Sequence, residues 1–254
     1  MKKLLSIIVF GTVLVTIASA DLVQMKMGAG AWMSSPSINP SYTEEERTYT
    51  SNETAYIQGY AWMSVKHWVH IVPNIRIEYT ATEQQGKVQG DFDSIKTSDF
   101  AHYKTSKFAH FNTTSDLANI KSIITHYDFI PYYTILDNNA WMIDVGLGIR
   151  LLKHTYTVSA TKNFPGYSEE KLLDTPFPFL YVRSRAQTVI KNIVVETDAK
   201  LAIPPLGFDI RAKVDYILAS IPNKPTIEVG YRVQGAFSHV INASGVYAGL
   251  NLRF

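Results

Sequence analysis

Apolar and polar residues alternate with a period of two through most of the chain after residue 20. The pattern is clearest within 206–219, where every second residue is apolar: Phe208, Ile210, Ala212, Val214 and Tyr216. Successive side chains of a strand point to opposite faces of a sheet, so such a segment predicts a strand with one apolar and one polar face.

The alternation predicts about ten strands in one all-β domain, with eight as the alternative. The weakest segments are 54–65 and 118–136. The ten segments are 22–33, 54–65, 68–80, 118–136, 140–157, 177–187, 191–203, 206–219, 225–238 and 244–254.

The connections between these segments differ in length. Long ones at about 34–53, 81–117 and 158–176 alternate with short ones near 66–67, 137–139 and 188–190. Bacterial membrane barrels have short periplasmic turns and longer outer loops. The sequence therefore predicts a single antiparallel up-and-down transmembrane β-barrel, whereas a soluble sandwich would turn its apolar faces inward to a core.

The first twenty residues have the three parts of a secretory signal peptide. Lys2 and Lys3 are followed by an apolar run to about residue 17 and then by Ala18-Ser19-Ala20. A basic start, a short apolar run and small residues at the cleavage site are typical of exported proteins. We expect 1–20 to be a cleaved signal peptide and 21–254 to be the barrel.

Composition narrows the class of protein further. Without residues 1–20 the chain has equal numbers of basic and acidic residues, so no basic surplus points to a nucleic-acid partner. The chain has no cysteine, so an exported form cannot use disulfides. No apolar run after the signal is long enough for a transmembrane helix, which needs about 20 residues.

Aromatic residues lie near the ends of many predicted strands. Amphipathic rings prefer the headgroup level of a membrane, which produces girdles at both interfaces. We expect the following rings to lie on the apolar, outward face: Trp32, Tyr60, Trp62, Trp68, Tyr79, Tyr132, Tyr133, Trp141, Tyr216 and Phe237.

The last ten residues form an apolar stripe that closes on an aromatic residue. Val246, Ala248, Leu250, Leu252 and Phe254 share one face. This segment resembles the C-terminal strand that outer-membrane barrels present to their insertion machinery. The residues that would carry such an assembly signal are Tyr247, Leu250, Leu252 and Phe254.

Three short stretches extend this resemblance. They are Gly230-Tyr231-Arg232, Pro178-Phe179-Leu180-Tyr181 and Tyr247-Ala248-Gly249-Leu250. They resemble a family of small Gram-negative outer-membrane β-barrel proteins with glycine-containing strands and no agreed activity. The resemblance implies location in the cell outer membrane, contact with its lipids and handling by the barrel-assembly machinery. It carries no catalytic residue over to this chain.

Charged residues of both signs occupy the polar faces of the predicted strands. Turned inward, they would form either a selectivity network in a narrow, porin-like channel for small solutes or a structural salt-bridge lattice in a largely filled lumen. Inward glycines (28, 30, 146, 148 and 230) would leave room or relieve crowding. The network is predicted to contain Asp144, Arg150, Arg183, Arg185, Glu196, Asp198, Asp209, Arg211, Lys213, Asp215, Glu228 and Arg232.

No motif predicts catalysis, a metal or a cofactor. Two Ser/His combinations, Ser238-His239 and His154 with Ser159, lack a Gly-x-Ser-x-Gly elbow. The acidic and histidine residues within 81–117 fit no zinc or calcium spacing. A non-enzymatic barrel is therefore the leading hypothesis. The alternatives are an adhesion barrel acting through 34–53, 81–117 and 158–176, and an outer-membrane lipid hydrolase.

Overall fold

The computed structural model describes most of the chain after residue 22. The described residues are 23–37, 48–51, 56–69, 71–89, 117–158, 167–172, 176–202, 207–235 and 242–254. The predicted signal peptide, 1–20, lies outside them, as does Phe237.

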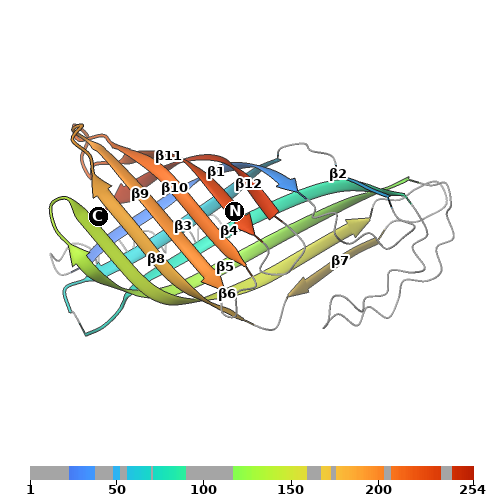
Figure 1. The fold of residues 1–254 in the computed structure, drawn as a ribbon, viewed down its shortest axis with the longest axis horizontal. Coiled ribbons are helices and arrows are strands. Elements are labelled where there is room, and N and C mark those ends of the chain that lie inside the picture. The colour runs from blue at the N-terminus through green and yellow to red at the C-terminus, as the bar shows by residue number, and fades with distance from the viewer. Residues whose placement is uncertain are drawn as a thin grey trace, which may run out of the picture.

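Ten antiparallel strands close into one barrel, which confirms the predicted fold class and the count of ten rather than eight. Each strand pairs with its neighbours along the chain, and the last strand pairs with the first (Figure 1). The strands are β1 (Val23–Ser37), β3 (Tyr56–His67), β4 (Asn74–Gln89), β5 (Leu117–Asp137), β6 (Trp141–Val158), β8 (Phe177–Gln187), β9 (Ile193–Ala202), β10 (Phe208–Ile217), β11 (Thr226–Gly235) and β12 (Asn242–Arg253).

Among the described residues, two short strands lie outside this ring. β2 (Thr48–Ser51) pairs with the last residues of β4, and β7 (Tyr167–Leu172) pairs with the last residues of β6. Both lie at the end of the barrel opposite the C-terminus and the short turns (Figure 1). The barrel therefore has a turn end, with the short turns, and an extended end, with β2 and β7. Bacterial barrels have their short turns in the periplasm and their longer loops outside the cell, so the turn end is assigned to the periplasm and the extended end to the cell exterior.

The first turn differs from its prediction. The turn was expected near 66–67 with a strand over 68–80, but the chain turns at 68–73 and β4 runs from Asn74 to Gln89. Pro73 has no N–H for a strand ladder. The backbone N–H of His67 donates to Oδ1 of Asn74 at 3.1 Å, and the N–H of Val72 to the carbonyl of Val69 at 3.2 Å, which closes the turn.

The outer wall of the barrel is apolar. Leu147 is 62 % exposed, and Val229, Leu250 and Leu252 also face outward. Because hydrocarbon offers backbone groups no hydrogen-bond partner, only a closed sheet can present such a surface to lipid. In the described part of the chain no helix is long and apolar enough to cross a membrane.

Part of the predicted aromatic girdle lies where expected. Trp68, Tyr133, Trp141 and Tyr216 are exposed near the turn end, at the level of one membrane interface. Tyr79 is also exposed on the outer wall and stacks at a tilt against Tyr127, with 5.4 Å between ring centroids.

Four rings expected on the outer wall are instead buried in the lumen, so that prediction was wrong. Trp32, Tyr60, Trp62 and Tyr132 are at most 8 % exposed. Their positions in the alternation explain the error: Trp32 shares its face with Gly28 and Gly30, which point inward. The hydrophobicity of a ring did not decide its side.

Inward glycines provide the space for these rings. A Cβ at Gly28 would lie 2.5 Å from Nε1 of Trp62, and one at Gly148 would lie 2.3 Å from the Phe179 ring. Likewise, a Cβ at Gly30 would lie 2.5 Å from the Tyr60 hydroxyl. These glycines therefore relieve crowding and leave little open space beside the wall.

Candidate functional site

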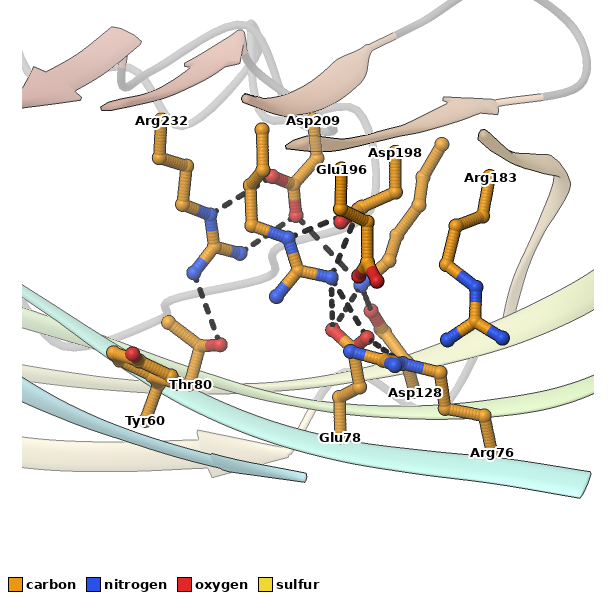
Figure 2. Close-up of polar contacts among 12 residues, drawn as sticks. Tyr60, Arg76, Glu78, Thr80, Asp128, Arg183, Glu196, Asp198, Asp209 and Arg232 are labelled. Atoms are coloured by element: carbon orange, nitrogen blue, oxygen red, sulfur yellow. Dashed lines mark hydrogen bonds and ion pairs between the residues drawn. The ribbon is translucent and has the colours of Figure 1, made fainter. Parts of the chain in front are cut away.

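The most distinctive feature of the interior is a network of ion pairs that crosses the lumen. Its members occupy every second position of their strands, for example Arg76 and Glu78 on β4 and Asp209 and Arg211 on β10. The alternation that turns the intervening apolar residues toward lipid turns these charges inward. Figure 2 shows side chains from opposite walls meeting in the middle.

Glu78 lies at the centre of this network and contacts three cations. Its carboxylate accepts hydrogen bonds from Arg76 and Lys200. Nη2 of Arg211 also donates to both of its oxygens, at 2.7 and 2.9 Å. Asp198 binds Nε of Arg211 from the neighbouring strand at 2.9 Å. One carboxylate of β4 is therefore bonded to strands β9 and β10 on the far wall (Figure 2).

Asp128 and Asp209 bridge the remaining cations. Asp128 accepts two hydrogen bonds from Arg150, both at 2.7 Å, and one from Lys200 at 2.7 Å. Asp209 accepts from Arg150 at 2.9 Å and from Arg232 at 2.8 and 2.6 Å. Arg150, Lys200 and Asp209 are each 0 % exposed. At this level the lumen is filled by paired charges.

A second cluster surrounds Lys213. Its ammonium lies 2.7 Å from Glu228, 3.3 Å from Glu196 and 3.4 Å from Asp215. Glu228 also accepts hydrogen bonds from the Tyr60 hydroxyl and, at 2.9 Å, from the amide of Asn251. These bonds join β10 and β11 to β3 across the lumen.

A third group lies closer to the turn end. Arg183 donates to Asp144, and the Thr134 hydroxyl donates to the same carboxylate at 2.7 Å. The structure thus brings eleven of the twelve predicted charges into three groups. The twelfth, Arg185, lines a cavity at the turn end instead.

Aromatic rings line the wall beside the guanidinium groups. The Arg76 guanidinium lies 4.2 Å from the centre of the Trp62 ring, and that of Arg232 lies 4.8 Å from Trp32. Cation–π contacts of this kind stabilise desolvated cations. They explain how large rings and charges share one interior.

The predicted network left out several of its members, although the alternation places Arg76, Glu78 and Lys200 on polar faces. Arg76, Glu78, Asp128 and Lys200 complete its centre, and His126 faces Nη2 of Arg232 at 3.3 Å. The signal that could have found Asp128 and His126 is their alternation with Tyr127 and Phe129, which are exposed on the outer wall.

His126, Asp128 and Asp209 form a compact group with ligand atoms within 4.8 Å of one another. Arg150, Lys200 and Arg232 already bind both of its carboxylates. A divalent cation added there would meet three cationic side chains, so the geometry is that of an ion-pair cluster. The histidines of the two Ser/His combinations, with Ser238 and Ser159, lie outside the residues whose side chains are described.

The solved structures that are similar to this protein share little of its sequence. No family model and no curated protein matches the sequence. Among solved structures, the protease OmpT of Escherichia coli is 10 % identical, covers 93 % of this chain and 98 % of its own, and has a TM-score of 0.49. Ail of Yersinia pestis, solved with a heparin analogue, is 10 % identical and has a TM-score of 0.40. The match covers 92 % of this chain and 99 % of Ail. Neisserial surface protein A is 13 % identical, with 92 % and 98 % covered and a TM-score of 0.30.

These likenesses are too distant to carry an activity over to this chain. The location follows from the barrel itself, whose closed antiparallel sheet has an apolar outer wall and a charged interior. Single-chain bacterial barrels with these properties reside in the outer membrane. The protein is an integral Gram-negative outer-membrane β-barrel.

Proposed function

We propose that this protein is a sealed, non-enzymatic surface barrel that interacts with its partners through its extended end. The observation that carries the proposal is the length of the strands there. β5 has 21 residues, β6 has 18 and β4 has 16, whereas about 9–11 residues suffice for a tilted strand to cross a bilayer. The excess of all three strands lies on the side where β2 and β7 add to the sheet.

The filled lumen supports the same proposal. Of the two interpretations of the inward charges, the structural lattice fits better than a selectivity network, because the central charges bind one another and are almost inaccessible to solvent. A barrel whose described centre is filled by paired charges would act at its surfaces rather than by conducting solutes. The extended end carries the longest strands and both added strands, which favours an adhesion or interaction role over a narrow channel.

The apolar wall also indicates the partners within the membrane. Outer-membrane lipids would contact the residues exposed there, such as Leu147 and Leu250. The barrel-assembly machinery would act on the C-terminal strand β12, which closes the barrel against β1. Tyr247 of the proposed assembly signal turns its ring into the lumen, whereas Leu250 and Leu252 face lipid.

Shortening the extended end tests this proposal. Gln84 of β4 pairs with Ser122 of β5, so replacing 85–121 by an Asn-Gly turn keeps the register of the remaining hairpin. We expect the shortened barrel to fold, because the lipid-spanning part and the network are intact. We expect cells that display it to lose the attachment to protein-coated, glycan-coated and host-cell surfaces that the full chain confers.

Folding would be checked by heat-modifiable gel migration. The matched control is a double substitution in a turn at the opposite end, Val189→Ser with Ile190→Ser, which should leave attachment unchanged. The proposal fails if the shortened chain attaches as well as the full chain, or if the full chain confers no attachment above that of cells lacking it.

A further inference from the structure

A cavity of about 260 Å³ opens at the turn end of the barrel, on the opposite side of the network from the extended end. Its lining is strongly basic among the residues that the structure describes. Five cationic side chains line it, with one carboxylate, that of Asp137. The five are Lys26, Lys66, Arg183, Arg185 and Arg253.

Three of these cations have partners. Lys66 binds Asp137 at 2.6 Å, which neutralises the carboxylate of the lining. Arg183 turns to Asp144, and Nη2 of Arg253 donates to Oε1 of Gln24 at 3.0 Å. Asp137 and Asp144 each offset one cation, whereas Gln24 carries no charge and leaves the charge of Arg253 in place.

Lys26 and Arg185 differ from the others. Within the described residues no carboxylate lies at ion-pair distance from either of them. Glu196, which is opposite Arg185 on the neighbouring strand, lies 3.3 Å from Lys213 and interacts with Arg185 only beyond ion-pair distance. Arg183, Arg185 and Arg253 repel the charge of Lys26, and the carboxylate of Glu196 attracts it more weakly.

Lys26 is half-buried in this cavity, and so is Arg185. Cations that are partly removed from water and repel one another are unfavourable unless an anion joins them. The rest of the interior follows that rule, since its cations bind carboxylates of the chain itself. Among the described residues, Lys26 and Arg185 line the cavity without a carboxylate at ion-pair distance, and Glu196 and Asp215 act on Arg185 only at longer range.

We propose that this cavity binds a small oxyanion, either a phosphate group or a dicarboxylate. Arg185 provides a planar fork of donors that suits two oxygens of one such group, and Lys26 provides a point charge beside it. The volume admits a small anion and is below that of a typical pocket for a drug-sized ligand. The site lies at the other end of the barrel from the surface proposed to act outside, and it does not depend on that proposal.

The test is titration calorimetry of the folded chain, 21–254, in an uncharged detergent and a phosphate-free buffer. The probes are inorganic phosphate and succinate. We expect saturable binding of at least one of them, and at least a tenfold weaker Kd after the double substitution Lys26→Gln with Arg185→Gln. Lys191→Gln is the matched control, because Lys191 is exposed in a turn at the same end and does not line the cavity.

Heat-modifiable migration would establish that each variant is folded, and Arg185→Lys, which keeps the charge, should retain part of the affinity. Absence of saturable binding of both probes, or an equal Kd in the double variant and the Lys191 control, would overturn the proposal. Repeating the titration in phosphatidylcholine nanodiscs identifies the source of the anion. Binding that persists indicates a soluble periplasmic anion, whereas binding that disappears only in the bilayer indicates that a lipid headgroup phosphate occupies the cavity.

Discussion

Glu78→Gln is expected to lower the free energy of unfolding by about 3–5 kcal/mol, because it breaks a buried ion-pair network by removing one partner. Glu78 contacts Arg76, Lys200 and Arg211, and both it and its partners are almost wholly buried. Glutamine keeps the size of the side chain but removes its charge. Three cations would then share the remaining carboxylates of the centre.

The matched control is the same substitution at Glu83, five residues along the same strand. Glu83 pairs with Lys121 at 2.8 Å, and the side chains are 25 % and 42 % exposed. Exposed pairs of this kind contribute about 0–1 kcal/mol. The measurement is reversible urea unfolding in lipid vesicles, followed by tryptophan fluorescence. Equal losses at Glu78 and Glu83 would show that the buried network does not stabilise the barrel.

Leu147→Arg is expected to destabilise the folded barrel in vesicles by about 2–4 kcal/mol, the cost of a cation on the lipid face near the bilayer midplane. Leu147 lies in the middle of the part of β6 that crosses the membrane and is 62 % exposed on the outer wall. If water surrounded this position, an exposed arginine there would change the stability of the barrel little. The size of the effect therefore measures whether lipid surrounds this face.

Val189→Arg provides the comparison. Val189 lies in the turn between β8 and β9 and is fully exposed, so an arginine there should change the stability by less than about 0.5 kcal/mol. Unfolding of both variants would be followed in the same vesicles. A Leu147→Arg barrel as stable as the Val189→Arg barrel would place this wall in water.

Much of the fold could be predicted from alternation, because a strand with one face in lipid and one in the lumen must alternate. Phe208 to Tyr216 on β10 illustrates this, since every predicted outward residue is outward and Asp209 and Arg211 are inward. The turn at 68–73 could not be located as well. Trp68, Val69 and Ile71 are apolar like strand residues, although they lie in a turn at the membrane interface.

The side of the sheet that a residue faces follows from its place in the alternation, even where its hydrophobicity suggests the other side. Tyr60 and Trp62 are inward, while Gly59 and Ala61, which alternate with them, are outward. Large rings were expected to face lipid because they are apolar. In this barrel they fill the lumen against inward glycines and pack beside arginines, so position in the pattern is a better guide than residue type.

The pairing of charges across the lumen could not be predicted. Glu78 and Lys200 are 122 residues apart, and Arg211 binds Glu78 across 133 residues. The alternation places Glu78, Lys200 and Arg211 on inward faces. Which of these charges meet depends on how far neighbouring strands are staggered when the sheet closes. That stagger is a property of the whole barrel. For the same reason Arg185, which has no carboxylate at ion-pair distance among the described residues, could not be distinguished from its paired neighbours.

Single-channel recording in a planar bilayer would show whether the ion-pair network seals the lumen. The folded chain, 21–254, would be inserted under the same conditions as a general porin that serves as the positive control. The network predicts no discrete openings of the barrel above the background of the bilayer, in samples shown to be folded by heat-modifiable migration. Reproducible openings with a defined ion selectivity, altered by charge reversal at Arg211 or Arg232, would contradict the claim and establish a channel.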